Sequence, residues 1–390
     1  MAGKYTNLGE HDDRFVNSIK IDLTRNIART LAGLQDEADF AIPSYIGACE
    51  DWTTVVIYSQ LLRIVALLSG RIFVGLPLCR DEEWLDTTIN YTLAVFTAVE
   101  SVKKLSPLTR GFFAPSLKEV QRLHHYRVNG ARMLTPILKE RHENLKDPSF
   151  EPPTDMLQFL IQNSGQQATD ALFQAYMQML VSLVAIQGTS MALTQVIYDL
   201  ALHPEYVEVL RKELEPIVAQ DNGRLSKTSI TKLKKMDSVL KESQRMNPPG
   251  SLSLIRLAMS DVVLSDGIRI PKGRYTAFSS IGTNYDPEHH PDPYTYKPWR
   301  FADLREEPGN ENKYQFVTTS PDSISFGHGK HACPGRFFAS NEIKIILAWI
   351  IIRYDFKFRE GEKRPENIYG RTQISPNQKA EVLFRKRVNV

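Results

Sequence analysis

Cysteine is scarce in this sequence. Among 390 residues there are three, Cys49, Cys79 and Cys333, and no two of them stand at Cys-x-x-Cys spacing. That spacing is typical of zinc ribbons and thiol oxidoreductases, so neither class is indicated. A few distant cysteines cannot build a disulfide scaffold, and their number favours a chain that folds in a reducing compartment. Any chemistry at sulfur therefore belongs to a single cysteine.

An excess of charge of one sign is also missing. The 48 basic and 45 acidic residues give a net charge of +3, and the basic residues are scattered along the chain. This pattern excludes the basic footprint of a nucleic-acid-binding protein. The opening stretch, "MAGKYTNLGEHDDRF", has no apolar run like those of signal peptides and membrane anchors. We expect no nucleic acid among the partners and no targeting segment here.

One long segment lacks charge altogether. Residues 171 to 198 contain no Asp, Glu, Lys or Arg, a composition that a membrane span would share. Four glutamines, Gln174, Gln178, Gln187 and Gln195, argue against lipid because their amides would find no partners there. A protein core can supply such partners. The segment is predicted to be a long helix through the centre of a large core.

Apolar residues recur at helical spacing over roughly residues 10 to 145, with breaks at "GLPLCRDEEW" and "LSPLTRGFFAPSL". The proline-rich connector "ENLKDPSFEPPTD" leads to a short helix predicted near Met156 to Gln162. Another helix is predicted to open at Pro204, because proline suits a first helical turn, and the next ends at "RMNPPG". The first two thirds of the chain are therefore expected to be helical.

The pattern changes after Gly250. "DVVLSDGIRI" alternates around an Asp-Gly turn and predicts a hairpin, and "AEVLFRKRV" predicts a closing strand. Residues 284 to 325 form a long irregular stretch, which in a compact domain is usually functional or pinned by specific contacts. The sequence predicts a mainly α fold with a minor antiparallel β part, in a single domain covering residues 1 to 390.

The stretch "FGHGKHACPG", residues 326 to 335, raises the question of what needs a thiol there. A lone cysteine is most often a small buried hydrophobe, and Cys49 and Cys79 keep that interpretation. Cys333 instead has glycines on both sides and the cationic neighbours Lys330, His331 and Arg336. Pro334 is expected to open a helix over residues 334 to 352, whose N-terminus favours an anion, so a thiolate at Cys333 is predicted.

Three other motifs could place a functional site in this stretch. Gly327, Gly329 and Ala332 imitate a dinucleotide-binding fingerprint, but no parallel βαβ unit with an acidic residue about twenty positions on surrounds them. A zinc site lacks a second cysteine at ligand spacing, and there is no G-x-S-x-G nucleophile elbow. None of these motifs accounts for the thiol.

The spacing F-x-x-G-x-x-x-C-x-G, filled by Phe326, Gly329, Cys333 and Gly335, resembles the haem-ligand signature of the cytochrome P-450 superfamily. The resemblance implies that Cys333 binds the iron of heme b (iron protoporphyrin IX) as a thiolate. Glycines in such a loop let the backbone lie close to a flat macrocycle, and amides directed at sulfur tune the metal. The resemblance extends over nearly the whole chain.

Other elements of the family pattern occur in the same order along the chain. "KESQR" supplies Glu242 and Arg245, and "YKPWRF" supplies Arg300. By themselves the first two would usually be an exposed i, i+3 ion pair. The resemblance implies instead a buried Glu-Arg-Arg network that pins the irregular segment beneath the haem.

The resemblance also implies three cations for the haem propionates. Arg256 lies in "SLSLIRLAMSDVVLSDGIRIPKGR", which is similar to the family's strand region after the conserved helix, and His331 lies just before the cysteine. Lys20, in "RFVNSIKIDLT", is the third candidate, although the tryptophan often found upstream in that helix is absent. These cations belong to the cofactor-binding set that the resemblance implies.

The sequence departs from the family pattern in the central helix. "VAIQGTS" has Gln187 where an acid or histidine is common and Gly188 where threonine is expected, with Thr189 one position later. Glycine inside a helix loosens the hydrogen-bond ladder and suits a kink. A shift of one residue turns a hydroxyl by about 100°. Proton delivery is then expected from Gln187, water or the substrate, or else Thr189 and Ser190 only bond to backbone carbonyls.

The match to the family begins near its third helix, so a cytochrome P-450 fold that is incomplete at its N-terminus is expected. The segments "FVGLPLCRDEEW" and "YKPWRF" are most similar in sequence to those of fungal members that oxidise terpenoid and related secondary metabolites. The implied activity is a monooxygenase that uses molecular oxygen on an apolar small molecule. Leu183, Ile186, Leu252 and Leu254 either line its pocket or belong to the core.

The chain contains no flavin or iron-sulfur motif, so the resemblance implies a partner, an NADPH-cytochrome P-450 reductase. Its docking is expected on the cysteine side through Lys330, Arg336 and Lys344. The family further implies a monomer at the cytosolic face of the endoplasmic reticulum membrane, or in the cytoplasm. Two alternatives stay open: a haem-thiolate isomerase or dehydratase that needs no reductase, and a non-catalytic truncated paralogue.

Overall fold

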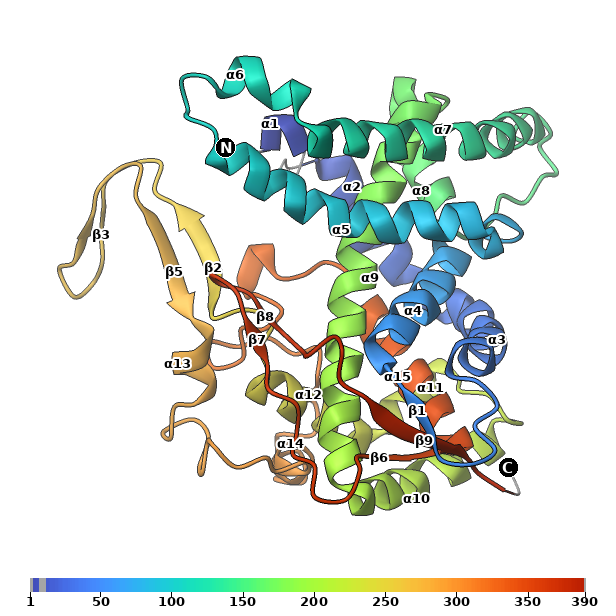
Figure 1. Ribbon diagram of the computed structural model, residues 1–390, viewed down its shortest axis with the longest axis vertical. Helices are drawn as coiled ribbons and strands as arrows, with labels where there is room; N and C mark the ends of the chain where they lie inside the picture. Colours follow the sequence, from blue (N-terminus) through green and yellow to red (C-terminus); the bar gives the residue numbers. More distant parts are fainter. Residues whose placement is uncertain (1–2, 7–11, 389–390) are drawn as a thin grey trace.

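The computed structural model describes residues 3–6 and 12–388. Long helices build most of it, and short antiparallel strands flank them, as the sequence predicts (Figure 1). The first half of the chain contains α1 (Gly3–Thr6), α2 (Asp13–Asn17), the π-helix η1 (Ser18–Leu23), α3 (Ile27–Ile46), α4 (Ile57–Phe73), η2 (Leu78–Arg80), α5 (Glu82–Lys104), α6 (Arg110–Phe113), η3 (Ala114–Ser116), α7 (Lys118–Asn144), α8 (Met156–Asn163) and η4 (Gly165–Gln167).

The longest helix, α9 (Ala171–Leu202), opens the second half of the chain. This half also contains α10 (Pro204–Gln220), α11 (Lys227–Lys232), α12 (Lys234–Met246), α13 (Ser280–Asn284), α14 (Arg300–Leu304), η5 (Gly329–His331) and α15 (Arg336–Arg353). The helices predicted near Met156 and at Pro204 are confirmed. The breaks predicted around residues 75–84 and 105–117 fall between α4, α5 and α7, and they are confirmed too.

The strands are short and pair only in antiparallel fashion among the described residues. β9 (Val382–Lys386) lies between β1 (Thr53–Val55) and β6 (Tyr354–Lys357), so the predicted closing strand is confirmed and pairs with a strand from the first half of the chain. The hairpin predicted in "DVVLSDGIRI" is β3 (Val262–Val263) with β4 (Arg269–Ile270). The other pairs are β2 (Leu252–Leu257) with β5 (Tyr275–Ser279), and β7 (Ile368–Tyr369) with β8 (Ile374–Ser375).

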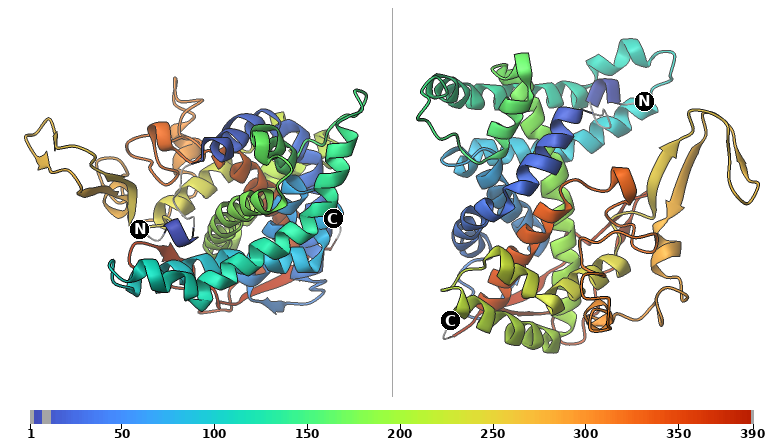
Figure 2. Two further views of the ribbon diagram at one scale, coloured as in Figure 1. Left: turned by 90° about the horizontal axis from the view of Figure 1, so that it is seen from above. Right: turned by 180° about the vertical axis from the view of Figure 1, so that it is seen from behind.

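The uncharged segment forms α9, which runs through the middle of the molecule and is crossed by α5 and α7 near one end (Figures 1 and 2). Asp170 caps this helix by accepting the backbone N–H groups of Leu172 and Phe173 at 3.0 and 3.1 Å. The length and composition of α9 would suit a membrane span. However, 67% of its most apolar 18-residue stretch is buried inside the protein.

Three of the four glutamines of α9, Gln174, Gln178 and Gln195, find protein partners, as expected for a core helix. The Nε2 atom of Gln174 donates to Ser164 Oγ at 3.1 Å, and that of Gln195 donates to Asn367 Oδ1 at 2.8 Å. Most buried apolar side chains around α9 belong to one continuous cluster that also includes α3, α4 and α15. The central helix therefore gives every neighbouring element a common surface to pack against.

Two features of the fold differ from the prediction. The final long helix, α15, begins at Arg336 and not at Pro334, because Gly335 (φ −89°, ψ 3°) is its N-cap. The ribbon of β2 and β5, extended by β3 and β4, stands away from the helical body in each view (Figures 1 and 2). Apolar side chains on this ribbon are exposed, among them Met259, Val263 and Phe278 at 76%, 66% and 62%.

Candidate active site

The cysteine loop is a tight turn between the irregular segment and α15. The backbone N–H of Cys333 donates to the carbonyl oxygen of Phe326 at 2.7 Å, which closes the loop. Gly327 and Gly329 have φ angles of +69° and +68°, a region that L-residues other than glycine rarely adopt. A Cβ on Gly327 would also lie 3.3 Å from the carbonyl oxygen of His331. The loop conformation therefore explains these glycines.

The environment of Cys333 has opposing effects on the pKa of its thiol. Burial raises its pKa, and the backbone N–H groups of Gly335 and Arg336, together with the positive charge of Arg336, only partly oppose that rise. The helix N-terminus therefore favours an anion at the sulfur, as the sequence predicts, but burial outweighs this effect. A metal ion would reverse this balance, because coordination deprotonates a thiol outright.

A cavity of about 430 Å³ meets this thiol and α9. Its wall is mostly apolar, and it includes Cys333 and Phe326 from the cysteine loop as well as Gln187, Gly188 and Thr189 from α9. Further lining residues come from α5, α12, α15 and the segment before the loop: Phe96, Leu240, Ala339, Ile343 and Phe316. Five residues that the sequence singled out from two distant motifs thus share one cavity.

The distal residues on α9 keep their polar groups free. The Oε1 atom of Gln187 is buried without a hydrogen-bond partner among the described residues. No heavy atom lies within 4 Å of the position that a Cβ of Gly188 would occupy. Thr189 is 4% exposed, and Ser190 Oγ donates to Leu61 of α4 at 3.4 Å and not to a carbonyl of its own helix. The chain is α-helical through Gly188.

The four leucine and isoleucine candidates for the pocket wall occupy different environments. Leu183 lines the cavity, whereas Ile186 is 1% exposed within the core. Leu252 lies on the exposed ribbon at 41% exposure. A side-chain carbon of Leu254 would be 3.8 Å from a Cβ on Gly327, so this residue contacts the cysteine loop from the outside. Only the first of the four is a direct candidate for substrate contact.

The three predicted propionate partners, Arg256, His331 and Lys20, are exposed and lie outside the cavity wall. Their elements nevertheless border the cysteine loop. β2, which carries Arg256, donates from Ser253 Oγ to the carbonyl oxygen of Ile324 at 3.0 Å. A Cβ on Gly335 would lie 3.7 Å from Ile19 of η1, the element that carries Lys20. Across the described ranges, residues 3–6 and 12–388, no carboxylate forms an ion pair with any of these three cations.

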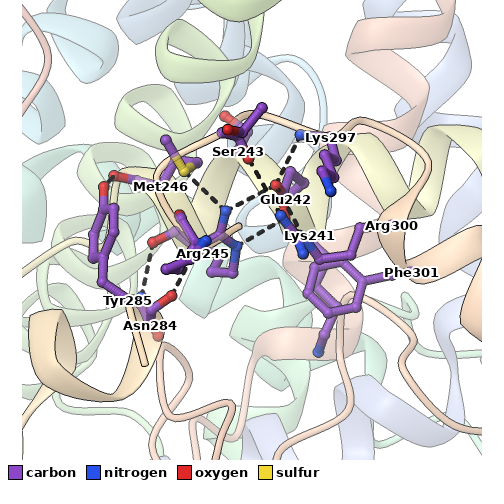
Figure 3. A network of polar contacts seen from close by, with 12 residues as sticks. Lys241, Glu242, Ser243, Arg245, Met246, Asn284, Tyr285, Lys297, Arg300 and Phe301 are labelled. Atoms are coloured by element: carbon purple, nitrogen blue, oxygen red, sulfur yellow. Dashed lines mark hydrogen bonds and ion pairs between the residues drawn. The ribbon is translucent and has the colours of Figure 1, made fainter. Parts of the chain in front are cut away.

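The structure brings Glu242, Arg245 and Arg300 together in a buried network (Figure 3). Glu242, which is 0% exposed, accepts from Arg245 Nε and Nη2 at 2.8 Å each and from Arg300 Nε at 3.1 and 3.2 Å. The same carboxylate accepts the backbone N–H of Lys297 at 2.9 Å. Arg245 Nη1 donates to the carbonyl oxygens of residues 284 and 293 at 2.8 and 2.7 Å. The network therefore fastens the irregular segment to α12.

Sequence reasoning missed a second polar cluster on the same helix. Asp237 accepts the backbone N–H of Phe316 at 2.8 Å and pairs with Arg305 at 3.3 Å and Lys344 at 2.5 Å. Lys241 is also buried on this face. The signal in the sequence was present, because Asp237, Lys241 and Arg245 recur every four residues on one helix face.

This cluster corrects one predicted surface. Lys344 is 6% exposed and its ammonium pairs with Asp237, so it cannot contribute to a docking surface as predicted. Lys330 is exposed. Arg336 is half-buried, with Nε donating to the carbonyl oxygen of Val317 at 3.2 Å and Nη1 donating to that of Cys333 at 2.9 Å. One of the three proposed docking cations is therefore structural.

These residues fit a haem. The cavity is apolar and open above Gly188, the backbone N–H groups of Gly335 and Arg336 favour negative charge on the half-buried thiol, and three cations without carboxylate partners within the described ranges lie on elements around the loop. A dinucleotide does not fit, because the glycines of the loop follow an irregular segment and not a parallel strand. A mainly helical fold that presents one loop cysteine to such a cavity under a long central helix defines the haem-thiolate class of protein.

The comparison with protein families agrees with this class. The model of the family described as cytochrome P450 matches residues 42–384, and the chain belongs to the cytochrome P450 family. Proteins of this family carry heme b, and this chain is accordingly a haem-dependent monooxygenase, an oxidoreductase that uses molecular oxygen. The family uses a redox partner, oxygen and a small-molecule substrate.

Relatives from fungi are similar over almost the whole chain. Cytochrome P450 monooxygenase BOA4 of Botryotinia fuckeliana is 39% identical over 387 residues, which cover 99% of this chain and 78% of that protein. Cytochrome P450 monooxygenase BOA7 of the same fungus is 42% identical, over 95% of this chain and 74% of its own length. Among solved structures, retinoic acid bound cyanobacterial CYP120A1 has a TM-score of 0.72 at 20% identity, covering 96% of this chain and 78% of its own, which establishes the shared fold.

Proposed function

We propose that Cys333 supplies the thiolate that binds the haem iron, and that the cavity between it and α9 is where oxygen and an apolar substrate meet. The observation that carries the proposal is the single cavity lined by both Cys333 and the Gln187–Thr189 segment. Bound haem supplies the activation of oxygen for insertion into a C–H bond. The protein supplies the ligand, an apolar enclosure and the polar groups that handle protons.

The chain's own residues have distinct roles in this proposal. The N–H groups of Gly335 and Arg336 stabilise negative charge on sulfur and fix its direction. Thr189, which is buried at the cavity, and Gln187, whose Oε1 has no partner among the described residues, hold a water molecule or a substrate hydroxyl above Gly188. The apolar wall excludes bulk water from the reacting centre.

Arg256, His331 and Lys20 would hold the propionate groups of the haem. All three cations are exposed and surround the cysteine loop on different elements, and long arginine and lysine side chains can turn toward a new anion at little cost. Charge reversal at Arg256 should lower the retention of haem by the folded protein, which gel filtration followed by pigment absorbance measures. Unchanged retention would remove Arg256 from this role.

The substrate is an apolar small molecule, and we propose a terpenoid or a related fungal secondary metabolite that is hydroxylated. The cavity wall around Leu183, Phe96 and Ile343 supports an apolar substrate, and similarity to fungal monooxygenases supports the metabolite class. Candidate substrates should shift the Soret band of the oxidised protein as they displace water from the cavity. A panel of terpenoids that fails to do so, beside polar molecules that succeed, would overturn this class.

Thiolate ligation is tested by the spectrum of the reduced, carbon monoxide-bound protein. We expect a strongly red-shifted Soret band in wild type and its loss in Cys333→Ala. Cys49→Ala and Cys79→Ala are matched controls, because both thiols are buried away from the cavity and should leave the band intact. A band that survives in Cys333→Ala would end the proposal.

A second candidate function is a haem-thiolate isomerase or dehydratase. It is favoured by one observation, that Gly188 offers no hydroxyl where oxygen activation usually has one. Such an enzyme needs neither NADPH nor oxygen. Product formation that continues in an anaerobic reaction without NADPH would favour it over the monooxygenase, and strict dependence on both would exclude it.

The proposed electron donor is an NADPH-cytochrome P-450 reductase that meets the chain, as a monomer, on the cysteine side. Lys330 is exposed there and Arg336 is half-exposed, so both can face an acidic partner. Lys330→Glu should slow reduction of the haem by the reductase, more strongly at low salt. A rate that does not change with this substitution at any salt concentration would contradict docking at this surface.

We also propose that the protein sits at the surface of the endoplasmic reticulum membrane. The turn between α5 and α7 carries Leu108, Phe112 and Phe113 at 89%, 84% and 58% exposure. Exposed lysines flank it at both ends, Lys103 and Lys104 on α5 and Lys118 on α7. Apolar side chains between cations suit the headgroup region of a bilayer that contains anionic lipids.

A further inference from the structure

Lys241 is a buried cation that is held by neutral oxygen atoms. It lies on α12 next to Glu242, is 5% exposed, and donates to the carbonyl oxygens of Gln315 and Thr318 at 3.1 Å each and to Ser323 Oγ at 2.9 Å. Within the part of the chain that the structure describes, no carboxylate forms an ion pair with this ammonium. All three of its N–H donors are therefore used to fix the irregular segment.

The segment that Lys241 holds is joined to the cysteine through Arg336. Val317 lies between the two residues whose carbonyl groups accept from Lys241, and its own carbonyl accepts from Arg336 Nε at 3.2 Å. Arg336 Nη1 donates to the carbonyl oxygen of Cys333 at 2.9 Å. A displacement of the 315–318 turn is thus transmitted through one guanidinium to the backbone of the cysteine.

A second connection runs through the aromatic side chains. Phe316, within the same turn, packs edge-on against Phe326 with ring centroids 5.2 Å apart. The carbonyl oxygen of Phe326 accepts the backbone N–H of Cys333 at 2.7 Å. Ser323, the third acceptor of Lys241, lies three residues before Phe326. Both routes start at one ammonium and end at Cys333.

We propose that Lys241 is a positioning residue that sets the orientation of the Cys333 thiol by holding the 315–323 segment against α12. The inference rests on the proposed function, because the orientation matters when the thiol binds a haem iron. It adds a residue that the buried Glu242 network does not contain. Lys241 acts on the sulfur ligand through two intermediates and is not itself part of the cavity lining.

The arrangement makes the orientation of the thiol depend on pH. Burial lowers the pKa of Lys241 to about 8, although Asp237 and Asp322 act in the opposite direction. A neutral amine has two N–H donors for three acceptors, so the segment loosens as pH rises through about 8. The free energy of unfolding increases over the same range. Burying the charged ammonium destabilises the folded state fully below the folded pKa of about 8, and this penalty disappears as pH rises toward the unfolded value of 10.5.

Other ionisable groups around Lys241 lie on α12, on the stretch after α13 and on the irregular segment. They are Asp237, Arg245, Glu288, His289, His290, Lys313 and Asp322. Burial lowers the pKa of His290 to about 4, so this side chain stays neutral through the range concerned. Most of these groups border a polar cavity of about 390 Å³, which gives water access to the ammonium.

The test is a pH titration of the reduced, carbon monoxide-bound protein from pH 6.5 to 9.5. Wild type is expected to lose its red-shifted Soret band in favour of a less shifted one with a midpoint near pH 8. Lys241→Met should show a several-fold smaller fraction of the red-shifted band at pH 7 and no dependence on pH, with Lys241→Arg restoring the band without the midpoint. Lys234→Met, on an exposed position of the same helix, should behave as wild type.

Each outcome is decisive. Lys241→Met with wild-type spectra at every pH overturns the positioning role, while wild type without a red-shifted band at any pH overturns the thiolate proposal itself. Should Lys241→Met not fold, hydrogen exchange of the wild-type backbone over residues 315–333 replaces it. After correction for the intrinsic rate, protection there should fall above pH 8 while the urea midpoint of unfolding does not, and constant protection would contradict the proposal.

Discussion

The hydroxyl of Ser69 on α4 donates to Glu342 Oε1 on α15 at 2.7 Å, in a position where the carboxyl group is fully buried. The other oxygen, Oε2, has no partner among the described residues. Burial raises the pKa of Glu342 to about 8, and the Ser69 hydroxyl opposes this only in part. The raised pKa favours the neutral acid at pH 7, and the side chain lies between α4 and α15, of which α15 borders the active-site cavity.

This acid should make stability depend on pH. The folded pKa lies above the unfolded value of 4.5, so the folded state binds the extra proton between these values, and stability falls as pH rises from about 4.5 to 8. The loss by pH 7 is on the order of 3 kcal/mol. Glu342→Gln should remove this dependence and unfold at higher urea than wild type at pH 8. A wild-type midpoint unaffected by pH across this window would contradict the assignment.

The buried network on α12 should be far more sensitive than an exposed ion pair. Arg245→Met leaves the carboxylate of Glu242 buried with one guanidinium fewer, and we expect a loss of about 3 to 5 kcal/mol in the free energy of unfolding. Lys146→Met, which breaks an exposed i, i+3 pair with Glu143, is the control and should leave unfolding unchanged. Equal effects in the two variants would show that the network adds nothing to stability.

Gly188 should accept a larger side chain. No heavy atom lies within 4 Å of its Cβ position and α9 is helical there, so Gly188→Ala should stabilise the protein by about 1 kcal/mol. Gly188→Thr adds a hydroxyl at the cavity and should lower the fraction of NADPH lost as hydrogen peroxide during turnover. Urea unfolding measures the first effect and a peroxide assay the second. Destabilisation by the alanine would mean that the helix needs a glycine there.

The apolar turn between α5 and α7 should bind anionic vesicles. Replacing Phe112 and Phe113 with serine removes most of the exposed apolar surface of α6, and co-sedimentation with vesicles that contain phosphatidylserine should fall several-fold. A control pair, Met259→Ser with Val263→Ser, removes comparable exposed apolar surface from the ribbon and should not change sedimentation. Equal losses in both variants would indicate unspecific adsorption.

The sequence was most informative where the pattern was periodic or where a motif had a rigid geometry. The uncharged stretch predicted α9 because its length and glutamines left few other solutions. The spacing around Cys333 predicted the loop, since its glycines adopt positive φ angles. The position of Glu242 on a helix did not by itself distinguish a buried network from a surface pair, and that distinction came from the resemblance.

The burial of charged side chains was the feature that the sequence predicted least well. Lys344 was expected on the surface because lysine rarely lies in a core, yet Asp237 on another helix pairs with it and makes burial possible. The start of α15 was wrong by two residues since Gly335 takes the cap position after Pro334. β1 was not predicted, because three residues pair only when β9 lies beside them. The errors at Lys344 and at β1 depend on a partner far away in sequence, whereas the start of α15 is set by the neighbouring Gly335.

The irregular stretch from residue 284 to 325 has consequences for biogenesis. Apart from α14 it contains little regular structure, and its order depends on side chains of one helix, α12, that bond to it across 39 to 79 positions of sequence. Such long-range contacts form late, because their loop entropy has to be overcome first. We therefore expect haem to bind late in maturation, after the helical body has folded and the cavity has formed.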